Sequence, residues 1–216
     1  FHLLLWNIYN FFITYANLDE WGAKDKKSVN SKNVLDRWIL SKLNQLTQKI
    51  TDCLEKYDAF IATGEIESFV EDLSTWYVRR SRGRVGSSAQ SEEDKNFCFE
   101  TLNEVLITII RLLAPFTPFL AEEMYKNLTN KESVHLANWP DVNAEMIDKK
   151  LEKQMVLVRE VVERGHAARK EKQIRVRQPL QSIKVNTDSE KPEESLLMLI
   201  KEELNIKEVS WQKREG

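Results

Sequence analysis

Hydrophobic residues recur along most of the chain at spacings of three and four, the pattern of helices with one apolar face. The first stretch, from Leu3 to Leu18, is apolar nearly all round and predicts a helix buried on several sides. Further helices are predicted over residues 34–57, 60–82, 92–113, about 115–128 and about 143–172. Ser31 or Asn33 can cap the second helix, and Ser91 can cap the fourth.

The period changes after Pro179. Ile183–Val185 and Ile206–Trp211 alternate as short strands do, and Glu193–Leu204 between them is helical. The chain is therefore predicted to be mainly α, with an antiparallel helix bundle over residues 1–178 and a small α+β appendage over residues 179–216. Only 6 glycines and 5 prolines among 216 residues also argue against an all-β fold with many tight turns.

The apolar N-terminal stretch does not predict a membrane span. It is short for a bilayer, contains Asn7 and Asn10, and lacks the basic segment and small-residue cleavage site of a signal peptide. It begins in mid-pattern without an initiator methionine. We interpret it as a core helix truncated from a longer parent protein, and expect no membrane partner.

Charge and motifs narrow the possible functions. Lys and Arg total 32 against 34 Asp and Glu, so a globally basic nucleic-acid binder is excluded, although a local basic patch is not. Cys53 and Cys98 lie in helical patterns and are expected to be buried thiols in a reducing cytosol. No zinc spacing, glycine-rich phosphate loop or catalytic motif occurs, so no metal site, cofactor site or catalytic residue is predicted in this chain.

A first basic cluster follows Trp76-Tyr77 at the end of the third predicted helix. Its four arginines are Arg79, Arg80, Arg82 and Arg84. Guanidinium groups match phosphate oxygens and stack on exposed bases, which suits RNA. The alternative is structural, because arginines also complement a helix C-terminus and pair with acids such as Glu71 and Asp72. Trp76 and Tyr77 are interpreted as core residues rather than base-stacking platforms.

A second basic cluster runs from Arg159 to Arg177, where basic residues outnumber acidic ones. If the segment Ile174–Leu180 is extended, Arg175 and Arg177 project to the same side. This composition indicates RNA binding, and the alternative is a solvated helix face. The candidate contacts here are Lys170, Lys172, Arg175, Arg177 and Gln178.

Several stretches of the chain together match the pattern of a known protein family. They are LDRWILS at 35–41, LSTWYVRRSR at 73–82, LAPFTPFLAEE at 113–123, SVHL with Trp139-Pro140, VRQPL at 176–180 and ELNIKEV at 203–209. With them the chain resembles the C-terminal, post-catalytic part of isoleucyl-tRNA synthetases, which are class I aminoacyl-tRNA synthetases, and looks closest to their eukaryote-like branch. It departs from the family pattern at Gly83–Gly86, where further basic and aromatic residues are usual.

The resemblance implies an α-helical bundle that grips tRNA on its anticodon side. It also implies a cytoplasmic parent that joins isoleucine to tRNA with ATP and Mg²⁺ bound in catalytic parts outside this chain, so the fragment is expected to be non-catalytic. By position, the RNA contacts would be Arg79, Arg80, Arg82 and Arg84 first, with Arg175, Arg177 and Gln178 second, while Lys170 and Lys172 would steer the RNA backbone.

Two other interpretations stay open at this point. The basic residues could dock the catalytic and editing domains of the parent, leaving the module with little RNA affinity of its own. The same module could also come from a valine enzyme, although the arginine run argues against that.

Overall fold

The computed structural model describes residues 1–22 and 31–212. Contacts divide the chain into two compact units, Phe1–Asp148 and Lys149–Gly216. The division falls before the long charged helix, whereas the predicted domains divide after residue 178. The difference arises because this helix packs against the C-terminal helix of the second unit.

The first unit is a helix bundle, as predicted. Its main helices are α1 (His2–Leu18), α2 (Val34–Glu55), α3 (Ala59–Asp72), α5 (Glu92–Leu113) and α6 (Pro118–Thr129). Side-chain caps fix three of the starts, and Asp58 caps α3 by accepting a hydrogen bond from the Ile61 N–H. Asn33 accepts a hydrogen bond from the Leu35 N–H and Ser91 accepts one from the Asp94 N–H, while Pro118 opens α6. Short 3-10 turns cover Gly86–Ser88, Val134–Leu136 and Ala144–Met146.

The helix predicted over residues 60–82 is helical throughout but changes type near its end. After α3, a π-helical segment occupies Leu73–Val78, followed by the short helix α4 (Arg79–Ser81) and a 3-10 turn at Arg82–Arg84. The wider π turn inserts an extra residue per turn and is common at functional sites. The first arginine cluster therefore begins just where this irregular segment ends.

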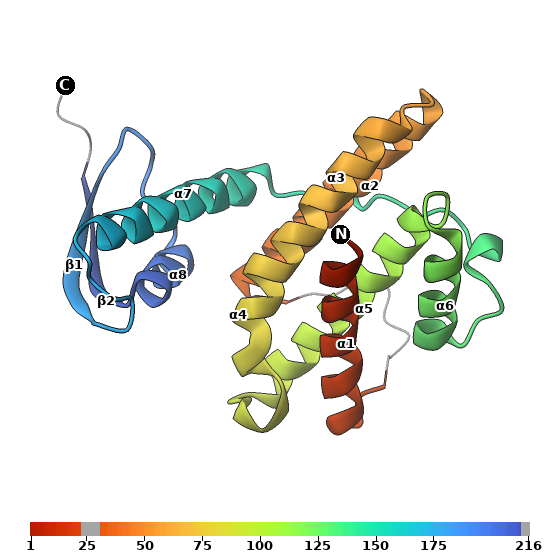
Figure 1. Ribbon diagram of the computed structural model, residues 1–216, viewed down its shortest axis with the longest axis horizontal. Coiled ribbons are helices and arrows are strands. Elements are labelled where there is room, and N and C mark those ends of the chain that lie inside the picture. Colours follow the sequence, from red (N-terminus) through yellow and green to blue (C-terminus); the bar gives the residue numbers. More distant parts are fainter. Residues whose placement is uncertain (23–30, 213–216) are drawn as a thin grey trace. The chain divides into compact units, whose positions relative to one another are not determined.

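The core of the bundle lies between helices that Figure 1 shows running side by side, α2 with α3 and α1 with α5. Phe12, Trp21 and Phe99 pack their rings together, with centroids 5.6–6.3 Å apart, and so join α1 to α5. Leu3 and Trp6 of α1 are exposed, 73% and 48% respectively. The prediction that α1 is buried on several sides is therefore wrong for this chain on its own.

The second unit confirms the predicted strand–helix–strand order. It contains α7 (Lys149–Glu171), β1 (Leu180–Asn186), α8 (Glu194–Leu204) and β2 (Ile206–Gln212). The two strands are parallel, with Leu180 opposite Ile206, and α8 supplies the crossover that a parallel pair needs. Gly165 of α7 permits close packing, because a Cβ there would overlap the Leu204 side chain of α8.

Candidate nucleic-acid interface

The end of the long third helical run presents two exposed arginines, Arg79 and Arg82, with Arg80 partly buried beside them. Arg79 is ordered by its neighbours: its Nε donates to the carbonyl of Thr75 at 2.8 Å, and its guanidinium lies 6.0 Å from the ring centre of Trp76. The exposed guanidinium groups of Arg79 and Arg82 can donate hydrogen bonds to phosphate or carboxylate oxygens from outside the chain.

The aromatic pair before the arginines divides between core and surface. Tyr77 is fully buried, which confirms its interpretation as a core residue. Trp76 is only partly buried and carries Arg79 over its ring. A cation placed over an indole ring is attracted by the π electrons. Trp76 therefore contributes to the surface around Arg79 as well as to the packing of the bundle.

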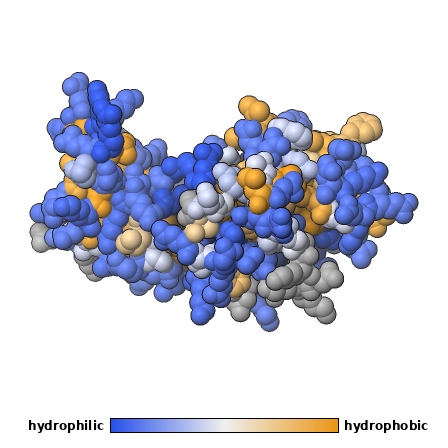
Figure 2. Space-filling view, turned by 90° about the horizontal axis from the view of Figure 1, so that it is seen from below, coloured by the Kyte–Doolittle hydropathy of each residue, from blue (hydrophilic) through white to orange (hydrophobic). Residues whose placement is uncertain are grey.

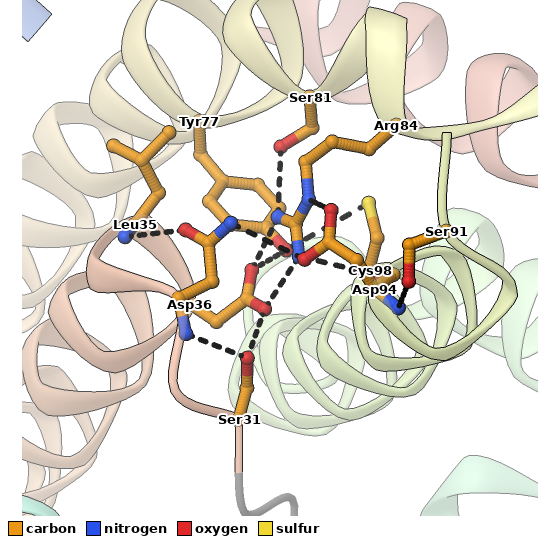
Figure 3. Close-up of polar contacts among 10 residues, drawn as sticks. Ser31, Leu35, Asp36, Tyr77, Ser81, Arg84, Ser91, Asp94 and Cys98 are labelled. Carbon is orange, nitrogen blue, oxygen red and sulfur yellow. Dashed lines mark hydrogen bonds and ion pairs between the residues drawn. The ribbon is translucent and has the colours of Figure 1, made fainter. Parts of the chain in front are cut away.

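Arg84 lies inside the bundle, although the sequence analysis predicted it to be one of the RNA contacts. Its side chain is 11% exposed and forms a two-pronged ion pair with Asp36, with Nη1–Oδ1 and Nη2–Oδ2 distances of 2.7 Å (Figure 3). Its Nε and Nη2 donate to the two carboxylate oxygens of Asp94 at 2.8 Å. RNA contact by Arg84 remains a prediction, which this burial disfavours because its donors are engaged within the chain.

Opposite charges dominate the electrostatics around Arg84. Burial alone would lower the pKa of Arg84, but hydrogen bonds to Asp36 and Asp94 outweigh it and raise that pKa well above its usual range. For the acid Asp94, burial has the opposite effect and would raise the pKa, but the hydrogen bonds from Arg84 outweigh burial and lower that pKa. Arg84 and Asp94 are therefore charged at neutral pH.

Asp36 joins further groups to this ion pair. Its carboxylate is completely buried and accepts hydrogen bonds from the hydroxyls of Tyr77, at 2.7 Å, and Ser31, at 2.6 Å. Burial raises the pKa of Tyr77 well above its ordinary value, so its hydroxyl stays protonated and can donate to Asp36 at neutral pH.

The two cysteines are buried thiols, as predicted. Burial raises the pKa of the Cys98 thiol to about 11, so this thiol is neutral at pH 7. Cys53 is also buried, and neither cysteine forms a disulfide.

The second cluster lies at the end of α7 and in the segment leading to β1. Lys170, Lys172, Arg175, Arg177 and Gln178 all expose their side chains. The segment is not extended as the sequence analysis supposed. It turns at Val176–Arg177, where the Gln178 N–H donates to the Arg175 carbonyl at 3.0 Å, so the expected same-side projection of Arg175 and Arg177 does not apply.

Arg169 holds this turn from within. The side chain is buried, and its Nη1 donates to the carbonyls of Arg175 and Gln178 at 3.0 and 3.1 Å. Its Nη2 donates to the carbonyl of Leu204 at 2.6 Å. Arg169 thus satisfies backbone acceptors at the end of α8 and in the turn, and its charge is directed inward rather than to the surface.

Comparison with known proteins identifies the module. A family model described as the anticodon-binding domain of tRNA ligase matches residues 36–185. The chain belongs to this family. It is 43% identical to the isoleucine–tRNA ligase of Clostridium novyi and 42% identical to that of Deinococcus radiodurans, in each case over 96% of the chain. It is 40% identical over 97% of the chain to that of Thermus thermophilus. The chain spans only about a fifth of the length of these relatives.

The matched part of this anticodon-binding domain includes both basic clusters. The first lies in the unit Phe1–Asp148 and the second in the unit Lys149–Gly216. Figure 2 shows one face of the molecule, on which hydrophilic residues predominate and apolar residues form separate spots. Within residues 1–22 and 31–212, no helix is long and apolar enough to cross a membrane.

Sequence reasoning missed two residues that organise the first cluster of the anticodon-binding domain. In the sequence, Asp36 stands out only as part of LDRWILS, and Asp94 lies just after the helix cap Ser91. Both turn out to bind Arg84. A usable signal was present in Asp36, since an acid between the apolar positions Leu35 and Trp38 is expected to need a buried cationic partner.

Proposed function

We propose that this chain is the tRNA-binding, anticodon-side module of an isoleucine–tRNA ligase. The observation that carries the proposal is the family match over residues 36–185, together with isoleucine–tRNA ligases as relatives along nearly the whole chain. The parent would act in the cytoplasm and join isoleucine to its tRNA. ATP and Mg²⁺ would bind in catalytic parts of the parent outside this chain, which itself carries no step of the reaction.

Within the module, Arg79, Arg80 and Arg82 are proposed as the principal contacts to the RNA. Support comes from the exposure of Arg79 and Arg82 and from the suitability of guanidinium groups for phosphates and unpaired bases. A second group of contacts is proposed in the other unit, where the side chains are also exposed: Lys170, Lys172, Arg175, Arg177 and Gln178. Arg84 is proposed to act on the RNA only through the segment that it anchors.

The test is binding of the purified chain to isoleucine tRNA and to an unrelated tRNA, at low and near-physiological salt. Selective binding that weakens steeply with salt supports the proposal, because each phosphate contact releases counterions. Equal binding to both tRNAs would place selectivity elsewhere in the parent. Absence of binding at low salt would contradict the proposal and favour docking of the parent's other domains.

A further inference from the structure

We propose that Asp36 is the positioning residue for the arginine segment Arg79–Arg82. In this role it binds the residues on both sides of the segment and so fixes how the exposed guanidinium groups meet RNA. The inference rests on the proposed function, because a positioning role requires that the segment contact RNA. Asp36 itself is completely buried, so its role is indirect.

The two ends of the segment meet on one carboxylate. Tyr77 precedes the segment and donates its hydroxyl to Asp36 Oδ1 at 2.7 Å. Arg84 follows the segment and donates Nη1 and Nη2 to Asp36 Oδ1 and Oδ2, both at 2.7 Å (Figure 3). The arginines are thus carried on a stretch of backbone tied at both ends, and displacing that stretch breaks at least one of these contacts.

Asp36 is itself held by the core and by a further hydrogen bond. Asp36 lies in the first turn of α2, between the core residues Leu35 and Trp38, and accepts a further hydrogen bond from Ser31 at 2.6 Å. A buried carboxylate and a buried guanidinium are costly apart and stable only in good mutual geometry. The pair therefore favours one arrangement of the segment, and a prearranged binding surface avoids the entropy cost of ordering on binding.

Asp94 offers a matched comparison for this role. It binds the same guanidinium as Asp36, at 2.8 Å, and also accepts a hydrogen bond from Asn33 Nδ2 at 3.3 Å. The Tyr77 hydroxyl, which precedes the arginine segment, donates to Asp36 and not to Asp94, and the Asp94 side chain is 37% exposed. Asp36→Asn and Asp94→Asn each make the chain one charge more positive. General attraction to the RNA backbone predicts tighter binding by both variants. Positioning predicts the opposite for Asp36→Asn.

The experiment measures isoleucine tRNA affinity of the whole chain over a series of salt concentrations, at a temperature where circular dichroism shows each variant folded. We expect Asp36→Asn to weaken binding about tenfold at low salt and to reduce the salt slope, because fewer phosphates are contacted together. Asp94→Asn should bind within about twofold of the unmodified chain. Amide exchange over residues 79–84 should accelerate in Asp36→Asn and change less in Asp94→Asn.

Tyr77→Phe is a second variant that tests the same role if Asp36→Asn does not fold. It removes one hydrogen bond to Asp36 and no charge. It should weaken binding several-fold with the core shape preserved. Unchanged affinity and slope in a folded Asp36→Asn or Tyr77→Phe would overturn the positioning role, as would equal losses in Asp36→Asn and Asp94→Asn. An unmodified chain that binds no tRNA would instead overturn the proposed function and, with it, this role.

Discussion

At the scale of single residues, two arginines that the charge pattern groups with surface cations are directed into the protein. Arg84 forms ion pairs with Asp36 and Asp94, and Arg169 donates to backbone carbonyls at the end of α8 and in the turn after α7. In both cases the guanidinium group reaches several acceptors at once, which its planar fork permits. The neighbouring exposed arginines are then held on a fixed backbone.

These partnerships could not have been predicted from local sequence. Arg84 and Asp36 are 48 residues apart, and Arg169 and Leu204 are 35 residues apart. The sequence showed that basic residues were concentrated near Arg84 and Arg169, but which of them faced inward depended on how distant helices packed. The burial of Tyr77, by contrast, followed from its place in an apolar stripe and was predicted correctly.

Arg169→Met should destabilise the second unit by about 2–4 kcal/mol, because buried carbonyls lose a charged donor. Amide hydrogen exchange in β1 and β2 measures this loss directly. Arg175→Gln, which changes an exposed side chain in the same turn, should leave exchange in the strands nearly unchanged. Equal protection in Arg169→Met and the unmodified chain would show that the carbonyls do not need this donor.

At the scale of elements, apolar periodicity predicted most helices and strands to within a few residues. The helix predicted from about residue 143 instead begins at Lys149, after a separate 3-10 turn at Ala144–Met146. The predicted fourth helix, residues 92–113, matches α5 (Glu92–Leu113), since Ser91 and the following acids mark its start. The π-helical turn at Leu73–Val78 was not predicted, because both π and α turns place apolar residues on one side every few positions. Tyr77 lies in this segment and donates its hydroxyl to Asp36, which is 41 residues away in the sequence, a contact that the local pattern does not show.

Close packing of α7 on α8 at Gly165 gives an element-level prediction. Gly165→Ala should destabilise the second unit by about 1–3 kcal/mol, because the new methyl group overlaps the buried side chain of Leu204. Gly64→Ala in α3 is the matched control. It meets nothing within 4 Å and should stabilise the first unit by about 0.5–1 kcal/mol through helix propensity. Amide exchange resolves the two units, and equal effects at the two sites would contradict the prediction.

Glu122 of α6 links this helix to the turn at Val134–Leu136 and should make the link sensitive to acid. The hydrogen bond from Lys126, followed by those from the Val134 N–H and the Ser133 hydroxyl, lowers the pKa of Glu122 to about 2. A pKa depressed by folding means stability that is present above the unfolded value, about 4.5, and is lost as pH falls towards 2.

Melting temperature measured from pH 6 to pH 2 tests this linkage. The unmodified chain should lose stability over the acid range, and Glu122→Gln should show a shallower loss because one titrating group has been removed. Glu123→Gln changes the neighbouring carboxylate and serves as the control. Parallel melting curves for Glu122→Gln and the unmodified chain would contradict the link.

At the scale of the whole molecule, the sequence is enough to indicate the family. The division of the chain into two units follows only from the structure. Motifs spread along the chain were enough to indicate an anticodon-binding module, and the family match over residues 36–185 agrees with them. The division at Asp148–Lys149 could not be predicted, because α7 has an ordinary amphipathic pattern and the sequence does not say which neighbour covers its apolar face. A net charge of −2 also conceals that basic residues are concentrated in two places.

The central claim is that exposed arginines after the π-helical turn bind tRNA. The most direct measurement compares isoleucine tRNA binding by the unmodified chain, by Arg79→Glu/Arg82→Glu, and by Lys49→Glu/Lys56→Glu, which makes the same charge change on exposed residues of the first unit away from the arginine cluster. We predict a loss of at least about tenfold and a shallower salt dependence for the arginine pair, against a small loss for the lysine pair. Equal effects of the two pairs, or no RNA binding by the unmodified chain, would contradict the claim.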